Sequence, residues 1–236
     1  MPRQPQTPKL EVIDLGRRAY RPVLRLQKEL VREVRSQPAR AVLLTVEHDP
    51  PVITLGRRGV DGDVLASPEA LSAAGVEVHQ SRRGGQATWH GPGQLVAYLI
   101  CRLDKRRLTL RGYVNRLEEA IIHTLGRFGI PGRRREEFPG VWAGGRKIAA
   151  VGVAVERWVT YHGLALNVDC DLANYESIVP CGLSASDVTS MERLGQPVSV
   201  EDVKPALAEC ICESFGFEPG VTRRLEQTRQ ESSSAT

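Results

Sequence analysis

Two residues of this 236-residue chain, one cysteine and one lysine, have neighbours that suit covalent chemistry. Cys181 lies between Pro180, which fixes the chain before it, and Gly182, which permits a tight turn after it. Lys147 stands at the head of an apolar run, where an ammonium group must pair, reach water or lose its proton. A nearby cation stabilises a thiolate nucleophile. We therefore expect Cys181 and Lys147 to meet in space and form an acyl-transfer site.

Each of these residues also has a simpler interpretation. A free cysteine is among the most often buried residue types, so Cys181 could be an unreactive core residue. Lys147 could stand at a strand end and point to water. His90 and His162, each followed by a glycine, are candidate bases or pocket residues, although a single histidine is more often structural. A Cys–His hydrolase that uses one of them therefore stays open at this point.

A glycine-rich stretch, RGGQATWHGPGQ (83–94), predicts the other wall of the site. Its glycines expose backbone amides that could hold a phosphate or a carbonyl group. The stretch matches neither the P-loop nor the dinucleotide-binding pattern. No zinc spacing and no cluster of carboxylates and histidines indicates a metal site.

The elements that position these residues follow from periodicity and capping. Apolar residues at helical spacing predict a helix over 20–35, and the clearest helix begins after Thr109 with Glu118 and Glu119 on its exposed side. Further helices are expected after Ser67 and after Ser199. Apolar runs predict the strands 41–47, 52–56, 76–80, 86–90, 94–103 and 161–169, and a hairpin around Gly144-Gly145.

Many of these strands follow one another as hairpins, and strands and helices do not alternate strictly along the chain. The pattern predicts an α+β fold in a single domain, with a mixed, largely antiparallel sheet flanked by helices. We expect the catalytic domain to span residues 11–220, between flexible tails at 1–10 and 221–236.

The overall composition favours a cytoplasmic protein. The chain has a net charge of +4 and no apolar run long enough to span a membrane, and its N-terminus has no apolar secretory signal. It also lacks the long basic block typical of nucleic-acid binding. Arginine pairs at 57–58 and 82–83 could attract an acidic partner. We expect a monomer with reduced cysteines.

Several motifs together resemble the lipoyl(octanoyl) transferase family, which moves an octanoyl group from acyl carrier protein to a lysine of a lipoyl domain. In family order they are EHDPPVITLGRRG (47–59), RGGQATWHGPGQLVAY (83–98), RKIAAVGV (146–153), HGLALNVD (162–169), IVPCGL (178–183) and VTSM (188–191). Two residues depart mildly from the family pattern: Trp89 stands where tyrosine is commoner, and Tyr175 stands where phenylalanine is commoner.

The resemblance implies a fold similar to biotin protein ligases and lipoate ligases, and it implies roles for residues. Cys181 would carry the acyl group as a thioester, and Lys147 would lower its pKa and shuttle protons. The acyl substrate would lie against Arg83, Gly84, Gly85, Gln86, Ala87, Thr88, Trp89, His90, Ala150, Val151, Gly152, Gly163, Leu164 and Ala165.

The resemblance also implies partners. The donor would be octanoyl-acyl carrier protein, and the acceptors would be lipoyl-domain proteins, namely the acyltransferase subunits of 2-oxoacid dehydrogenases and the glycine cleavage H protein. On their charge alone, the arginine pairs at 57–58 and 82–83 could dock the acidic carrier. No ATP and no metal would be needed.

Two further alternatives share this fold or its partners. One is an ATP-dependent lipoate or biotin ligase, which activates a free acid and needs no thiol; Cys181 argues against it. The other is an inactive module that binds carrier or lipoyl domains. The presence of both Cys181 and Lys147 argues against such a module.

Overall fold

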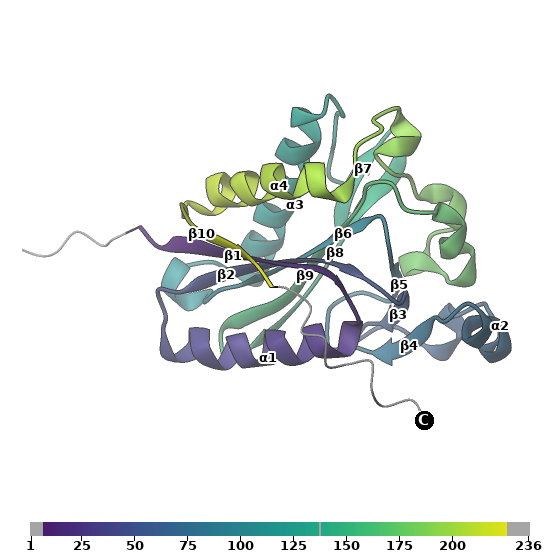
Figure 1. Cartoon of the computed structure of the whole chain (residues 1–236), viewed down its shortest axis with the longest axis horizontal. Coiled ribbons are helices and arrows are strands. Elements are labelled where there is room, and N and C mark those ends of the chain that lie inside the picture. The colour runs from purple at the N-terminus through teal and green to yellow at the C-terminus, as the bar shows by residue number, and fades with distance from the viewer. Residues whose placement is uncertain (1–6, 137, 226–236) are drawn as a thin grey trace, which may run out of the picture.

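The computed structural model describes residues 7–136 and 138–225, and within these residues a seven-stranded sheet forms the centre (Figure 1). Strands β10, β1 and β2 run parallel, whereas neighbouring strands from β2 to β7 run antiparallel. This sheet is mixed and largely antiparallel, as predicted. Its order is β10 (Glu218–Arg224), β1 (Lys9–Arg18), β2 (Ala41–His48), β6 (Gln94–Ile100), β9 (Val159–Asn167), β8 (Arg146–Glu156) and β7 (Gly140–Ala143).

Helices cover both faces of this sheet (Figure 1). Helix α1 (Tyr20–Ser36) packs on one face, and α3 (Leu110–Arg127) and α4 (Val200–Phe215) pack on the other. Strands between two helical layers are apolar on both sides, and every residue of β2 is buried. The predicted caps are confirmed: Thr109 accepts a hydrogen bond from the Gly112 amide at 3.0 Å, and Ser199 with Asp202 forms a capping box.

A smaller sheet lies at one side of the main sheet and is formed by β4 (Glu77–Gln80), β3 (Val52–Leu55) and β5 (Ala87–His90). Helix α2 (Pro68–Ala73) accompanies it (Figure 1). An apolar cluster that includes Ile53, Trp89 and Tyr175 joins this sheet to the segment after β9. That segment is built of short 3₁₀ helices at Leu172–Ser177, Pro180–Gly182, Ala185–Asp187 and Glu192–Leu194.

The main sheet extends past the predicted domain limits of 11 and 220 at both ends. Lys9 and Leu10, expected in a tail, belong to β1, and the Leu10 side chain is fully buried. Residues 221–224, also expected in a tail, belong to β10, which pairs with β1. Strand β10 is mostly exposed, so backbone pairing and not an apolar pattern defines it. The rest of the two predicted tails, residues 1–6 and 226–236, lies outside the described residues. In the described part no helix could cross a membrane.

Candidate active site

A cavity of about 420 Å³ lies between the small sheet and strands β8 and β9 of the main sheet. Cys181 and Lys147 both line it, so the two residues selected for their chemistry share one space. Most of the residues expected to contact the acyl substrate line it as well: Arg83, Gly84, Gly85, Gln86, Thr88, His90, Ala150, Val151, Gly152, Gly163, Leu164 and Ala165.

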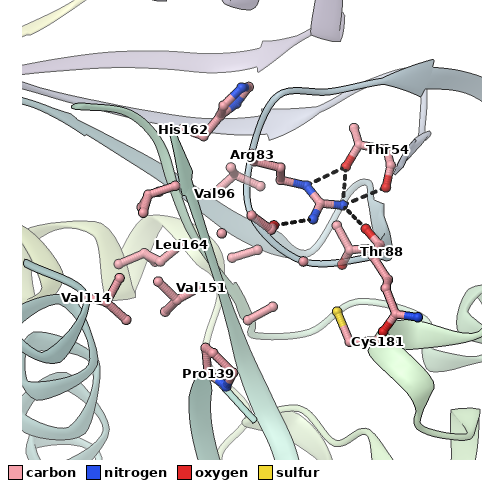
Figure 2. Close-up of a pocket in the computed structure, with 18 of the residues that line it drawn as sticks. Thr54, Arg83, Thr88, Val96, Val114, Pro139, Val151, His162, Leu164 and Cys181 are labelled. Carbon is pink, nitrogen blue, oxygen red and sulfur yellow. Dashed lines mark hydrogen bonds between the residues drawn. The ribbon is translucent and has the colours of Figure 1, made fainter. Parts of the chain in front are cut away.

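The cavity has two chemically different sides (Figure 2). Arg83 and Thr54 form a hydrogen-bonded polar side. The apolar side chains of Val114, Val151 and Leu164 lie together on the opposite side. The site can therefore hold an apolar chain while it presents polar groups to a reacting centre.

Arg83 forms the base of the loop 83–86, which we call the cradle. Its guanidinium group donates to Thr54 Oγ1 at 3.0 Å, to the Thr54 carbonyl at 2.6 Å and to the Gln86 carbonyl at 2.9 Å. It is only 6% exposed, and no carboxylate in the described residues forms an ion pair with it. Burial lowers the pKa of Arg83, and the charge of Cys181 opposes this shift.

Backbone hydrogen bonds attach the cradle to both sheets. The Gly84 amide donates to the Val153 carbonyl in β8 at 2.9 Å, and the Gly56 amide donates to the Gln86 carbonyl at 3.0 Å. Gly85 has a φ of 92°, and a Cβ there would lie 3.6 Å from Cys181 Sγ. The positive φ therefore favours glycine at this position, and the loop backbone lies beside the sulfur.

The tight turn expected at Pro180-Cys181-Gly182 is confirmed. The backbone of Cys181 is left-handed, with φ 55° and ψ 42°, and Gly182 follows with φ 77°. The cysteine is half-buried, and its Sγ lies 3.7 Å from the carbonyl oxygen of Ala87. The turn therefore presents the thiol to the cavity and not to the core.

A β-bulge aims Lys147 into the cavity. Val141 pairs with Ala149 while Trp142 pairs with Lys147, so Ile148 is an extra residue on β8. Ile148 and Ala149 both pack in the main core, and Lys147 lines the cavity at only 7% exposure. This burial contradicts the water-facing interpretation of the lysine.

Charges around Lys147 act on its pKa in both directions. Burial lowers the pKa of the lysine, the charges of Cys181 and Glu118 raise it, and Arg83 lowers it further. The Lys147 carbonyl also accepts from the Thr189 amide at 2.9 Å, which ties β8 to the segment that follows the cysteine. The lysine is therefore held where its protonation state depends on Cys181.

Buried hydrogen bonds hold His90 in one tautomer. Its Nδ1 lies 2.7 Å from Gln94 Oε1, and Gln94 Nε2 donates to Asn167 Oδ1 and to Tyr175 Oη. Because the amide nitrogen of Gln94 is used as a donor, its oxygen faces the histidine, and Nδ1 carries the proton. Burial lowers the pKa of His90 well below its usual value, so the ring is neutral. Gln94 and Asn167 lie inside the motifs 83–94 and 162–169 but were given no role of their own, and their signal is a polar residue inside an apolar strand.

His162 is also neutral. Burial lowers its pKa to about 3, and the charge of Arg83 adds to this effect. Its Nε2 lies 3.3 Å from Ser81 Oγ, and its backbone amide donates to Gln27 Oε1 at 2.8 Å. Neither His162 nor His90 forms a hydrogen bond with Cys181 in the described residues, so no Cys–His pair is present there.

Two residues expected at the substrate do not line the main cavity. Along β5, Thr88 and His90 face the cavity, so Ala87 and Trp89 face the opposite way because side chains alternate along a strand. Trp89 packs against Tyr175 in the apolar cluster below the small sheet. The expectation that Trp89 lines the acyl cavity is therefore corrected, whereas Ala87 borders a smaller space beside Cys181.

Glu118 was expected on the exposed side of its helix, and this prediction is wrong. The residue is 5% exposed, and its Oε1 accepts from the Gly140 amide at 2.8 Å. Its Oε2 lies 3.2 Å from Arg134 Nε. The spacing was informative, because Glu118 lies four residues after Val114 and three before Ile121, on the apolar stripe of α3.

The described residues contain no group of three or more histidine, cysteine or acidic side chains able to hold a metal ion. The site consists of a thiol, a buried lysine, a buried arginine and a backbone cradle.

Comparison with known proteins identifies the class to which this fold and site belong. Residues 19–212 match the lipoyl protein ligase A/B catalytic domain, and the chain belongs to this family. Within it, the chain is similar to the curated octanoyltransferases of Maridesulfovibrio salexigens (42% identical, covering 85% of this chain and 94% of the relative) and Solibacter usitatus (45% identical, covering 88% and 94%). The chain is therefore a member of the lipoyl(octanoyl) transferase family, as its motifs predicted.

Solved structures show the same fold at low identity. A lipoate-protein ligase A bound with ATP superposes with a TM-score of 0.73 at 16% identity, covering 94% of this chain and 90% of that one. A biotin protein ligase from Aquifex aeolicus gives a TM-score of 0.53 at 14% identity, covering 87% and 70%. The predicted similarity to both ligase folds is confirmed.

Proposed function

We propose that the protein transfers an octanoyl group from octanoyl-acyl carrier protein to the target lysine of a lipoyl domain, through a thioester on Cys181. The shared cavity of Cys181 and Lys147 is the observation that carries this proposal. Among the described residues, no ion pair neutralises the Lys147 ammonium, so its charge acts on the thiol. The similarity to curated octanoyltransferases supports the choice of acyl group.

In the first half-reaction the Cys181 thiolate attacks the carbonyl carbon of the octanoyl thioester. The bond from that carbon to the pantetheine sulfur breaks, and Lys147 gives its proton to the departing thiolate. One thioester replaces another, so the step is nearly balanced in energy and requires no ATP.

In the second half-reaction the neutral amine of the target lysine attacks the Cys181 thioester. An amide bond forms and the carbon–sulfur bond to Cys181 breaks. The amine nitrogen loses one proton, which the now neutral Lys147 accepts, and this restores the starting ammonium and thiolate. The step is downhill because an amide is more stable than a thioester.

The polar cradle suits the charge that develops on the carbonyl oxygen. The Gly84 amide already donates to Val153, whereas the Gly85 amide has no backbone acceptor in the described residues. Gly85 also approaches Cys181 closely. We therefore place the Gly85 N–H in the oxyanion hole, where one donor is worth on the order of 3 kcal/mol.

The opposite side of the cavity suits the acyl chain. Val114, Val151 and Leu164 provide apolar contacts, and the cavity volume of about 420 Å³ is typical of small-molecule sites. All five cysteines are free, which fits a reducing compartment such as the cytoplasm.

Intact mass spectrometry tests the proposal directly. The protein is mixed with octanoyl-acyl carrier protein without ATP, beside Cys181→Ala. We expect an adduct of one octanoyl group in the wild type, absent from the variant and discharged by an apo lipoyl domain. Transfer that appears only with ATP and free octanoate would identify an adenylating ligase and contradict the proposal.

A further inference from the structure

A buried carboxylate is connected to Lys147 through one glycine of β7. Glu118 reaches from α3 to the backbone of β7, where its Oε1 accepts from the Gly140 amide. Gly140 in turn lies against the lysine, since a Cβ at this position would be 2.9 Å from Lys147 Cε and 2.3 Å from the Ala149 carbonyl. Glu118, Gly140 and the Lys147 side chain therefore form one continuous set of contacts.

We propose that Glu118 is a positioning residue for Lys147: its carboxylate fixes the start of β7 against the lysine side chain and holds the lysine in its ammonium form. A buried carboxylate is costly unless it is paired or hydrogen-bonded. A neutral side chain at position 118 could also accept a hydrogen bond from the Gly140 amide. This hydrogen bond alone therefore does not require the negative charge of Glu118. The inference rests on the proposed function, in which Lys147 must hold a proton before the first half-reaction.

The charges that face Lys147 come from three elements. Cys181 lies on the turn after β9, Glu118 on α3, and Arg83 on the cradle. The two acidic groups raise the pKa of Lys147 against the effect of burial, and Arg83 acts in the opposite direction. Arg134 is 45% exposed at its side chain and pairs with Glu118, so it weakens the field of the carboxylate at the lysine.

The test measures Lys147 itself and needs no substrate. The chain has five lysines, so lysine labelled with ¹³C at Cε gives a small set of signals, and Lys147→Arg assigns the one of interest. Titration follows this signal in the wild type, Glu118→Gln, Arg134→Gln and the matched control Glu119→Gln. Glu119 carries the same charge on the same helix but forms no ion pair in the described residues.

We expect the pKa of Lys147 to fall in Glu118→Gln, to rise in Arg134→Gln and to stay unchanged in Glu119→Gln. An unchanged pKa in Glu118→Gln would overturn the proposal. If this variant does not fold, Arg134→Gln decides, because a shift of the opposite sign is required there. Glu118→Asp, which keeps the charge, should lie closer to the wild type than Glu118→Gln.

A kinetic arm separates this proposal from the proposed function. The rate of octanoyl-enzyme formation should decline at high pH as Lys147 loses its proton, and Glu118→Gln should move this decline to lower pH. If the pKa moves and the rate profile does not, the role of Lys147 as the acid is wrong while the role of Glu118 stands. If neither moves, the role of Glu118 is wrong.

Discussion

Arg83 places a second positive charge beside Cys181, and all its side-chain hydrogen bonds within the described residues go to neutral oxygens. The guanidinium group is buried among carbonyl and hydroxyl acceptors of Thr54, Gln86 and Gly84. These contacts require the planar fork of an arginine, which lysine cannot reproduce. Arg83 therefore holds the cradle in place and brings a positive charge to the cavity that contains Cys181.

We expect Arg83→Lys to slow acylation of Cys181 by about tenfold or more, because a charged hydrogen-bond donor is worth on the order of 1.5–3 kcal/mol. The unpaired oxygens should also lower the free energy of unfolding by about 1–3 kcal/mol. Single-turnover acylation and denaturant titration measure the two effects. Arg32→Lys, on the exposed side of α1, is the control. A wild-type acylation rate in Arg83→Lys would contradict this role.

At the residue scale, the sequence was sufficient where residue type and immediate neighbours decide the outcome. Cys181 was selected because proline and glycine flank it, and Lys147 because it precedes an apolar run. Glu118 was missed because its charge suggested solvent, although its spacing placed it on the buried stripe. Trp89 was misplaced because membership of a motif does not say which face of β5 a side chain occupies.

Close contact between the cradle and β8 depends on Gly152. A Cβ there would lie 2.9 Å from the Gly84 carbonyl and 3.2 Å from Arg83 Cδ. The strand can therefore approach the loop only because this position has no side chain. The same contact brings Gly85 and Arg83 to the cavity that contains Cys181.

We expect Gly152→Ala to displace the cradle. The rate of octanoyl transfer should fall strongly, whereas the melting temperature should fall only slightly. Gly126→Ala is the control, because nothing lies within 4 Å of a Cβ at that exposed position of α3. Alanine in a helix should raise the free energy of unfolding by about 0.5–1 kcal/mol there without changing activity. Transfer at the wild-type rate by Gly152→Ala would show that the close approach is not required.

At the element scale, local sequence signals located the helices and the hairpin that have capping or turn residues of their own. Capping residues located α3 and α4, and Gly144-Gly145 located the β7–β8 hairpin. Strand β10 could not be found, because Glu218–Arg224 is polar and exposed and exists by pairing with β1. The bulge at Ile148 also has no local signal, since it depends on how β7 and β8 align.

Across the whole molecule, exposed arginines gather beside the cavity. Arg57, Arg58 and Arg82 are exposed, and Arg58 also lines the cavity, whereas Arg83 is buried and cannot take part in surface docking. None of the three exposed arginines forms an ion pair in the described residues. They are therefore available to an acidic carrier protein.

We expect reversal of these three charges to glutamate to raise the KM for octanoyl-acyl carrier protein and to spare a small octanoyl thioester. Added salt should weaken the wild-type interaction in the same way, because exposed charges are screened. Arg25→Glu and Arg32→Glu on α1 are controls that test whether charge reversal at any exposed arginine raises this KM. Equal effects on the carrier and the small thioester would contradict docking at this surface.

The buried histidines predict an acid-sensitive fold. Burial lowers the pKa of His48 to about 4 and that of His162 to about 3, from an ordinary value of 6.5. The unfolded chain therefore binds more protons below pH 6.5, and stability is lost as the pH falls from 6.5 towards these values. Each such group contributes a slope of up to about 1.4 kcal/mol per pH unit.

We expect the free energy of unfolding, measured by urea titration, to fall steeply between pH 6.5 and 5. Each buried histidine should contribute up to about 1.4 kcal/mol per pH unit to this fall. His162→Asn should reduce the slope, and asparagine tolerates the left-handed backbone found there, with φ 58°. His123→Gln, at an exposed position of α3, should leave the slope unchanged. An equal slope in His162→Asn and the wild type would contradict this origin of acid sensitivity.

The left-handed backbone at Cys181 has a consequence for how this chain can evolve. Most residues with a Cβ cost about 1–2 kcal/mol in this conformation, whereas glycine has no Cβ and asparagine tolerates it through local hydrogen bonds. Folding alone therefore favours replacement of the thiol, and the proposed thioester chemistry is what would retain it. In a duplicated gene that is no longer under selection for activity, we expect Cys181 to be among the first residues replaced. The encoded protein would then be more stable but would lack the thiol.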